Sequence, residues 1–310
     1  MDPLTDVLML SRVRGTVAAT VYAGEGWGLD IANIPGAAFH AITAGTAWLD
    51  LDGHASRRLM PGDLVLLPGG ARHQLRSDPG RPCEVFDHAA AQRALANDGR
   101  LDVGEGPVHT RILCASYRQD STVTAPLLSL LPPLISLPAD PERPTDHILR
   151  LLSHEIGRAR PGGPTVLDRL LDVLLIHIIR SWLVDADTSR LPPSWLAALR
   201  DPVITAALTA LHTDPARAWT LQSLARHLGI SRATLSRRFP ALVGEPPLAY
   251  LTRWRMELAA RRLTATTGPI GPIARSVGYT SEYAFNRAFN RVHGITPGRY
   301  RTRHPAEPAT

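Results

Sequence analysis

Two segments in the last third of the chain repeat one pattern of glycine, serine and arginine. Each has an apolar helical stripe, a turn at Gly229 or Gly278, and then Ser231 or Ser281. An arginine follows each serine six positions later, at Arg237 or Arg287. Glycine readily adopts the left-handed conformation that ends a helix, and serine caps the next helix. Arginine near a helix start can donate two hydrogen bonds to a guanine edge in the major groove. The pattern therefore predicts two helix-turn-helix units that bind DNA.

Apolar residues determine which side of the second helix in each copy faces solvent. Leu235 and Phe239 in the first copy, and Phe285 and Phe289 in the second, share one helical face and are expected to be buried. Polar side chains near the start of each helix then face outward. The candidate DNA-binding residues are Arg232, Ala233, Ser236 and Arg237 in the first copy and Ser281, Glu282, Tyr283, Asn286, Arg287 and Arg291 in the second.

The charge distribution separates this prediction from its alternative, a helical bundle coated with arginine. Residues 195–310 contain 16 Arg and six acidic residues, a net charge of +10. The rest of the chain contains 18 Arg and 22 acidic residues, a net charge of −4, and the two parts give the overall +6. A basic third beside an acidic remainder indicates a polyanionic partner. Two matching copies inside it favour DNA.

One long helix is expected between the two copies. Pro246-Pro247 provides a helix start, and the sixteen residues from Leu248 to Leu263 form one continuous helical pattern. Such a helix spans about 24 Å, which is enough to hold two recognition helices apart. One chain can then enter two successive major-groove segments on the same face of DNA, roughly one turn apart.

Residues from about Trp219 to Arg301 resemble the C-terminal DNA-binding domain of the AraC/XylS family of bacterial transcription regulators. The resemblance is carried by Ile273-Ala-Arg-Ser-Val-Gly-Tyr279, by Phe285-Asn-Arg-Ala-Phe289 and by Gly294-Ile-Thr-Pro297-Gly-Arg-Tyr300-Arg301. It implies a set of base-contacting residues in the two recognition helices. These are Ala233, Ser236 and Arg237 in the first helix and Glu282, Tyr283, Asn286 and Arg287 in the second.

Two residues depart from what this resemblance leads one to expect. Pro240 lies inside the first recognition helix and lacks a backbone donor, so the last turn is expected to kink. Glu282 would stand beside the phosphates, which repel a carboxylate, unless it accepts a hydrogen bond from a cytosine amine.

The first part of the chain has a different sequence pattern. From Gly15 to about Phe86, short apolar runs alternate with turns that contain glycine and proline. Turn signals every eight to twelve residues predict a small antiparallel sandwich or barrel. Within this region Gly62-x5-Pro68-x-Gly70-x2-His73-x3-Ser77 is similar to the second conserved motif of cupin barrels, with Ser77 where that motif ends in Asn. The motif predicts a turn that directs His73 into the barrel mouth.

Residues from Met1 to about Leu183 resemble the cupin-type sensor domain attached to one subgroup of AraC-like regulators. Pro35-Gly-Ala-Ala-Phe39-His40, the segment from Pro61 to Pro68, and Thr110 to Cys114 through Leu130 to Pro133 carry the resemblance. It implies an effector site in the barrel, and dimerisation and signal transmission by the helices that follow. The pocket candidates are His40, Trp48 and His73; the alternative is two satisfied histidines at the rim and a core tryptophan.

The two cysteines, Cys83 and Cys114, are candidates for redox sensing, although a buried, inert cysteine is the commoner case. Metal-dependent cupins also have a His-x-His and a Glu, whereas this chain offers only His40 in that region. His40 and His73 together give two possible metal ligands, whereas catalytic metal sites usually have three protein ligands. We therefore expect no metal, no cofactor and no catalytic residue. The alternatives are a cupin-type metalloenzyme with an appended nucleic-acid-binding domain, and a nucleoid-type binder without sequence preference.

The predicted architecture is a two-domain α+β chain. Residues 1–190 form a cupin-like β-barrel followed by helices, with sensor and dimerisation roles. After a linker near Asp185 to Pro193, residues 195–305 form an all-α domain with both helix-turn-helix motifs. The stripes expected to mediate homodimerisation are Leu151, Leu152, Ile156, Leu170, Leu174 and Ile178.

The predicted function is sequence-specific transcription regulation rather than enzyme catalysis, controlled by a small-molecule or redox signal at the N-terminal domain. Activation is the commoner mode in the family, so an activator is expected. The expected partners are promoter DNA, RNA polymerase, an effector and a second copy of the chain. The chain shows neither a signal peptide nor a membrane span, and a cytoplasmic protein is expected.

Overall fold

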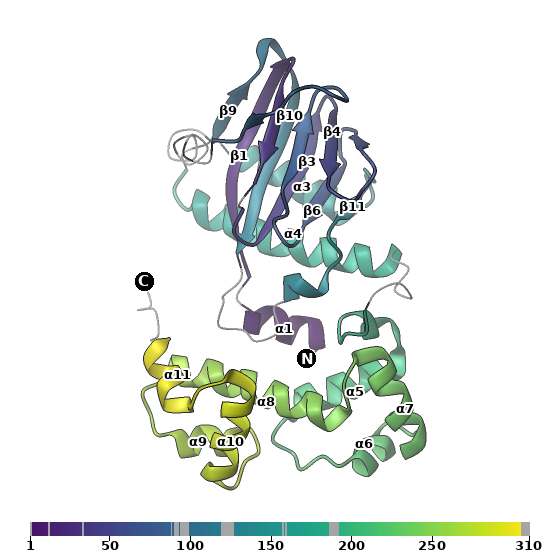
Figure 1. The fold of residues 1–310 in the computed structure, drawn as a ribbon, viewed down its shortest axis with the longest axis vertical. Helices are drawn as coiled ribbons and strands as arrows, with labels where there is room; N and C mark the ends of the chain where they lie inside the picture. Colours follow the sequence, from purple (N-terminus) through teal and green to yellow (C-terminus); the bar gives the residue numbers. More distant parts are fainter. Residues whose placement is uncertain are drawn as a thin grey trace. The chain divides into compact units, whose positions relative to one another are not determined.

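The computed structural model describes residues 2–11, 13–32, 34–87, 89, 93, 99–118, 127–156, 158, 160–185 and 192–304. They divide into two compact units (Figure 1). We call Val13–Gln119 with Leu131–Ala186 the sheet unit. We call Met1–Arg12 and Asp120–Leu130, together with Asp187–Thr310, the helical unit.

The sheet unit contains two sheets. The six-stranded sheet has the order β11-β6-β3-β10-β1-β9, and the five-stranded sheet has the order β5-β4-β7-β2-β8. The first is formed by β1 (Arg14–Glu25), β3 (Ala37–Ala44), β6 (Leu64–Leu67), β9 (Arg100–Val103), β10 (Glu105–Arg118) and β11 (Ile135–Leu137). The second is formed by β2 (Gly28–Ile31), β4 (Ala47–Leu51), β5 (Arg57–Leu59), β7 (His73–Arg76) and β8 (Glu84–Val85).

The two sheets pack face to face around one apolar core. Ile42 and Ile112 contribute to it from the six-stranded sheet, and Leu49 and Leu75 from the five-stranded sheet. In the part of the chain that the structure describes, no strand pair joins the two sheets, so the expected barrel is an open, cupin-like sandwich. The predicted α+β class, with a sheet-rich first part and a helical second part, is confirmed.

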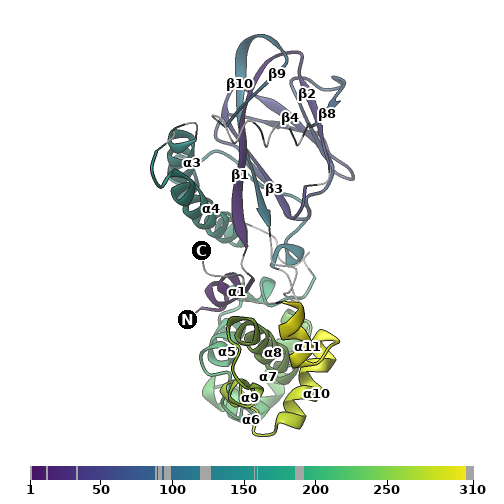
Figure 2. The ribbon, with the colours of Figure 1, turned by 90° about the vertical axis from the view of Figure 1, so that its left-hand side faces the viewer.

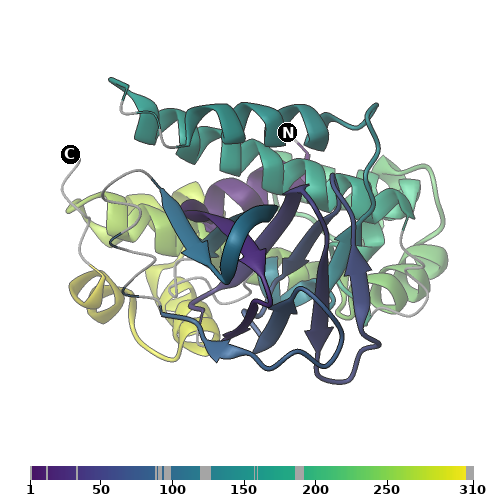
Figure 3. The ribbon, with the colours of Figure 1, turned by 90° about the horizontal axis from the view of Figure 1, so that it is seen from above.

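Two helices cover the outer face of the six-stranded sheet. These are α3 (Pro144–Glu155) and α4 (Gly163–Asp185), which pack on each other, with α4 against β1 and β11 (Figure 3). The Tyr117 hydroxyl donates to the Leu171 carbonyl at 3.0 Å and anchors α4. This cover explains why β3 is buried on both faces. None of the described helices is long and apolar enough to cross a membrane.

Half of the six apolar residues expected to mediate dimerisation are buried inside the sheet unit. Leu152, Leu174 and Ile178 are buried, whereas Leu151 is 54% exposed. Three further large apolar side chains on α4 are exposed. They are Val166, Val173 and Val184.

The helical unit is built around α8 (Pro247–Ala265), which contacts the elements on either side of it (Figure 2). One side is formed by η3 (Ala197–Arg200), α5 (Pro202–Thr213), α6 (Leu221–His227) and α7 (Arg232–Val243). The other is formed by α9 (Ile270–Ser276), α10 (Glu282–His293) and α11 (Pro297–Arg303). The long helix expected between the two repeats is therefore present.

Two segments from the first part of the chain also belong to the helical unit. They are α1 (Pro3–Ser11) and η1 (Leu127–Leu130), and α1 contacts α5, α8 and η1. The sequence predicted a single boundary between the two parts, near residue 190. Both segments come before that boundary in the chain but belong to the helical unit. The difference has a local cause: Leu4, Val7 and Leu10 form an apolar face on α1 and are all buried.

Candidate nucleic-acid interface and buried histidine cluster

The first helix-turn-helix has capped ends. Thr220 and Ser223 form a capping box at the start of α6, with the Ser223 N–H donating to Thr220 Oγ1 at 3.0 Å. Gly229, with φ of 66°, makes the turn, and Ser231 Oγ accepts from the Thr234 N–H at 3.0 Å at the start of α7. These caps satisfy donors that a helix start otherwise leaves unpaired. The predicted turn and cap residues have the geometry expected of them.

The outer face of α7 carries the residues named from the sequence. Leu235 and Phe239 are fully buried, whereas Arg232, Ala233, Ser236 and Arg237 are exposed. Pro240 does not end the helix, which continues to Val243 and closes with the Gly244 N–H donating to the Pro240 carbonyl at 2.9 Å.

The second helix-turn-helix repeats this arrangement. Gly278, with φ of 87°, makes the turn, and Ser281 Oγ accepts from the Ala284 N–H at 3.4 Å at the start of α10. Phe285 and Phe289 are fully buried. On the outer face, Ser281, Glu282, Tyr283, Arg287 and Arg291 are exposed and Asn286 is half-buried.

Tyr283 is the most prominent apolar group on the outer face of α10, with 72% of its surface exposed. The guanidinium carbon of Arg287 lies 5.8 Å from its ring centre. The carboxylate of Glu282 instead folds back toward α9, so close to Gly271 that a β-carbon there would meet its Oε1 atom. In the structure, this carboxylate is therefore not turned toward Tyr283 and Arg287.

Hydrogen bonds separate the arginines of the helical unit into two groups. Several hold the fold together: Arg238 pairs with Asp201 at 2.6 Å, and the guanidinium of Arg255 donates to the Pro215 carbonyl at 2.6 Å. Three more form hydrogen bonds within the unit. Arg253 donates to Glu245, and Arg262 donates to Ser276. Arg301 donates to the carbonyls of Leu263 and Thr267. The recognition helices carry four arginines that form no hydrogen bond or ion pair with the described residues: Arg232, Arg237, Arg287 and Arg291.

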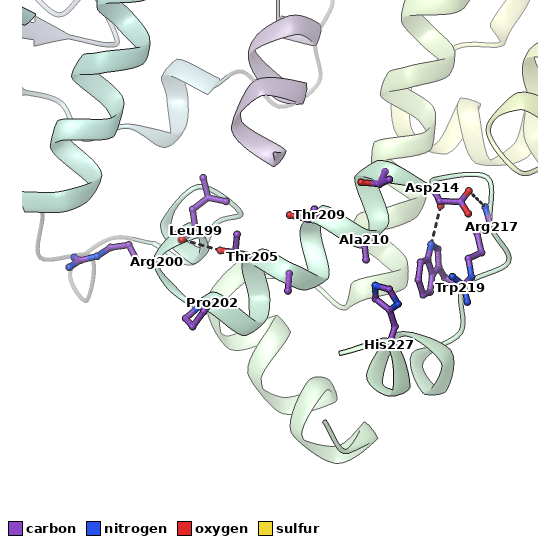
Figure 4. Close-up of a pocket in the computed structure, with 12 residues that line it drawn as sticks. Leu199, Arg200, Pro202, Thr205, Thr209, Ala210, Asp214, Arg217, Trp219 and His227 are labelled. Atoms are coloured by element: carbon purple, nitrogen blue, oxygen red, sulfur yellow. Dashed lines mark hydrogen bonds between the residues drawn. The ribbon is translucent and has the colours of Figure 1, made fainter. Parts of the chain in front are cut away.

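The helical unit also has a groove of about 740 Å³ beside α5, which the sequence did not predict (Figure 4). Thr205, Thr209 and Ala210 line one wall, and Trp219 stands at one end. The Trp219 indole N–H donates to the Asp214 carbonyl at 3.0 Å. The guanidinium of Arg217 lies 4.0 Å from the indole ring centre, so the aromatic end of the groove is held in place.

Two histidines and a cysteine meet inside the sheet unit. β3 pairs with β10 so that His40 is directly opposite Cys114, and their Nδ1 and Sγ atoms are 3.1 Å apart. His73 reaches the same point from the other sheet, with its Nε2 atom 2.8 Å from His40 Nε2. All three side chains are buried. The structure thus brings together two of the pocket candidates, His40 and His73, and one of the two redox candidates, Cys114.

Only one arrangement of hydrogens fits this cluster with neutral rings. The Ala71 carbonyl can only accept, so His73 Nδ1 donates to it at 2.7 Å and His73 Nε2 must accept. His40 Nε2–H then donates to His73, and His40 Nδ1 accepts from the Cys114 thiol. Burial lowers the pKa of both histidines, and proximity to His73 lowers that of His40 further. Burial raises the pKa of the Cys114 thiol to about 12.

His40, His73 and Cys114 form a line of contacts and do not surround one common point. Nδ1 of His40 faces Cys114, and Nε2 of His40 faces His73. A metal ion bound to either nitrogen of His40 is therefore near only one of these two partners. Among the described residues, no group of three or more His, Cys, Asp or Glu side chains could hold a metal ion.

Trp48 and Cys83 lie apart from this cluster. Trp48 is on β4 between Ala47 and Leu49, which face the core, so its half-buried ring is on the outer face of the five-stranded sheet. It is therefore neither beside the histidines nor in the core. Cys83 is half-buried just before the edge strand β8, and burial raises the pKa of its thiol. Both cysteines are free thiols in the structure.

The geometry defines a two-part protein with an open sandwich and a double helix-turn-helix, and comparisons with known proteins agree. Residues 2–184 match the cupin family model, and residues 224–303 match a helix-turn-helix domain model. The chain is 38% identical over 315 residues to a putative AraC-like transcription regulator of Streptomyces lividans, covering 99% of this chain and 100% of that protein. The chain belongs to the family of AraC-like transcription regulators.

Two further relatives show how far this similarity extends. The RCS-specific HTH-type transcriptional activator RclR of Escherichia coli (strain K12) is 29% identical over 98% of each chain. The DNA-binding domain of AdpA, solved in complex with a target DNA, is 28% identical and covers 33% of this chain and 92% of that domain, with a TM-score of 0.32. The protein is a DNA-binding transcription regulator whose cupin domain is consistent with control by a signal.

Proposed function

We propose that this regulator binds specific promoter sequences through the outer faces of α7 and α10. The single observation that carries the proposal is the lack of hydrogen-bond and ion-pair partners, among the described residues, for four exposed arginines on these helices. Arginine in a helix start is free to bind guanine when no carboxylate holds it. The proposed base-contacting residues are Ala233, Ser236 and Arg237 on α7 and Tyr283, Asn286 and Arg287 on α10.

The signal is proposed to be a small molecule that acts on the His40–His73 pair. These buried polar rings lie in an otherwise apolar core, where such groups are retained only if they are hydrogen-bonded. A ligand that bridges the two Nε2 atoms with one donor and one acceptor can replace their mutual bond. Redox sensing is the less favoured signal, because burial keeps Cys114 protonated and the thiolate is the reactive form.

We further propose that the protein is a homodimeric, cytoplasmic activator. The relative RclR is named as a transcriptional activator, which supports activation by this chain as well, with RNA polymerase as the partner. Exposed Leu151, Val166 and Val173 on α3 and α4 support a homodimer through these helices. A regulator of bacterial promoters acts in the cytoplasm, where its DNA lies.

Neighbouring arginines on α7 provide a matched test of DNA recognition. Arg237→Ala removes an arginine without a described ion-pair partner, whereas Arg238→Ala removes one that is paired with Asp201. We expect Arg237→Ala to cost about 1–3 kcal/mol of specific binding and to relax preference at one base position. Arg238→Ala should lower stability and leave base preference unchanged.

The measurement is a titration of full-length variants against a duplex selected from a random library by the wild-type protein, and against single-base variants of that duplex. Circular dichroism confirms that each variant is folded. An equal loss by Arg237→Ala on selected and random duplexes would show a phosphate contact and would contradict base reading.

A further inference from the structure

His212 is a fully buried side chain at the centre of the helical unit, and it is bonded on both of its nitrogens. Its Nδ1 atom lies 3.1 Å from Asp6 Oδ2, and its Nε2 atom lies 2.7 Å from the Tyr250 hydroxyl. Its ring stacks on Trp254 with centres 3.8 Å apart and planes 13° apart. His212 is on α5 and its two aromatic partners are on α8, but Asp6 comes from the opposite end of the chain, on α1.

The hydrogen bonds run in one direction through this cluster. The carboxylate of Asp6 accepts from His212 Nδ1–H, so His212 Nε2 accepts from the Tyr250 hydroxyl. The ring is neutral because burial, the largest cause, together with nearby Arg253, lowers the pKa of His212 to about 3. Each polar atom of the ring therefore has one defined role, and Asp6 supplies the end acceptor.

α1 reaches this cluster as a packed part of the helical unit. Leu4, Val7 and Leu10 are buried, and the views in Figure 1 and Figure 2 agree in placing α1 beside α5 and α8. Asp6 itself is only slightly exposed. A carboxylate is rarely buried without a partner, and here His212 is that partner.

Tyr250 extends the connection to a recognition helix. It lies in the first turn of α8 and is buried, and its ring meets that of Phe239 on α7 edge to face, with centres 6.0 Å apart and planes 70° apart. A direct series of contacts therefore joins α1, α5, α8 and α7, by way of Asp6, His212, Tyr250 and Phe239.

We propose that Asp6 is a positioning residue for DNA binding. Through His212, Asp6 fixes the position of the Tyr250 ring. Because this ring contacts Phe239, it also fixes the angle between the axes of α7 and α8. Because α8 separates the two helix-turn-helix units, this angle sets the spacing and direction of the first recognition helix relative to the second. The proposal rests on the family's DNA binding and is independent of which residues read bases or which signal is sensed.

The test uses full-length protein and a duplex selected by the wild type from a random library. Asp6→Ala removes the acceptor, Asp6→Asn retains an acceptor oxygen, and Met9→Ala changes an exposed residue of the same helix as a control. Tyr250→Phe removes the other bond to His212 while keeping the ring that meets Phe239. Each protein is titrated against the selected duplex and against versions with one base pair inserted or deleted between the two contacted segments.

We expect Asp6→Ala and Tyr250→Phe to bind the selected duplex about tenfold more weakly, the size of effect typical of a lost hydrogen bond to a charged or buried group. The wild type should bind the duplexes of altered spacing much more weakly than the selected duplex. For each of these two variants, the affinities for the selected and the altered duplexes should differ little. Asp6→Asn should recover most of the binding, and Met9→Ala should resemble the wild type.

Two results would overturn the proposal. One is unchanged binding by folded Asp6→Ala with the wild-type dependence on spacing. The other is that Asp6→Ala binds every duplex more weakly than the wild type by the same factor, whatever the spacing. That result would indicate a purely structural role for the contact. If Asp6→Ala does not fold, as judged by circular dichroism, Tyr250→Phe decides between the same outcomes.

Discussion

The Nε2 atoms of His40 and His73 lie 2.8 Å apart in the core of the sheet unit, each ring supplied by a different sheet. While both rings are neutral, one of them donates to the other. A further proton on either ring would place a positive charge in an apolar environment, where an ionised group is costly. This relationship makes the pair sensitive both to acid and to any ligand that competes for the bond.

The first prediction concerns the tautomers of this pair. We expect ¹⁵N NMR of the full-length protein to show His40 protonated on Nε2 and His73 on Nδ1 at pH 7. Because burial lowers the pKa of both rings, neither should become charged between pH 7 and 6, where an exposed histidine begins to titrate. A charged ring at pH 6.5, or the reverse tautomers, would contradict the assigned hydrogen-bond direction.

The second prediction concerns the pH dependence that His212 gives to stability. Its pKa in the folded protein is lowered to about 3, whereas an unfolded histidine titrates near 6.5. The unfolded chain therefore binds the proton more tightly, and stability that is complete above about pH 6.5 is lost as the pH falls. The loss is about 1.4 kcal/mol per pH unit below that point.

Denaturant unfolding between pH 7.5 and 5.5 tests this sign. Burial also raises the pKa of Asp6, which acts in the opposite direction, and Asp6 is present in both of the proteins compared. His212→Gln should be less stable than the wild type at pH 7.5 but should lose less on acidification. The other histidines with lowered pKa remain in both proteins: His40, His73, His177 and His293. The difference between the two curves is thus due to His212. Parallel curves would contradict the prediction.

The third prediction compares the turn glycines of the two copies. Gly229 and Gly278 both have positive φ, but a β-carbon at Gly229 meets nothing within 4 Å. At Gly278 it would lie 2.6 Å from the Ala216 carbonyl oxygen. Gly229→Ala should therefore cost about 1–2 kcal/mol from backbone strain alone, and Gly278→Ala distinctly more. Denaturant unfolding of the two variants measures the difference, and equal costs would refute this difference between the copies.

The helix-turn-helix pair could be predicted from the sequence because its determinants are local. Leu235 and Phe239, four residues apart, define the buried face, and Gly229 and Ser231 define the turn and cap within three residues. Caps and amphipathic faces act over one or two helical turns. The exposed face of α7 follows from these positions without knowledge of the rest of the fold.

Contacts between distant segments could not be predicted in the same way. The apolar face of α1 predicts a packed helix but does not identify α5 and α8 as its neighbours, and Asp6 is separated from His212 by 206 positions. The meeting of His40, His73 and Cys114 depends on strand register and on how two sheets face each other. Both are set by the tertiary fold and leave no short-range pattern.

The most direct test of the central claim is a comparison of selected and random DNA at two salt concentrations. The full-length protein should bind its selected duplex at least about a thousandfold more tightly than random duplex. Both affinities should fall as salt rises, because arginine–phosphate contacts release counterions, while the preference should persist. Equal affinity for selected and random duplexes, with the same steep salt dependence, would contradict sequence-specific regulation and indicate a general DNA-coating protein.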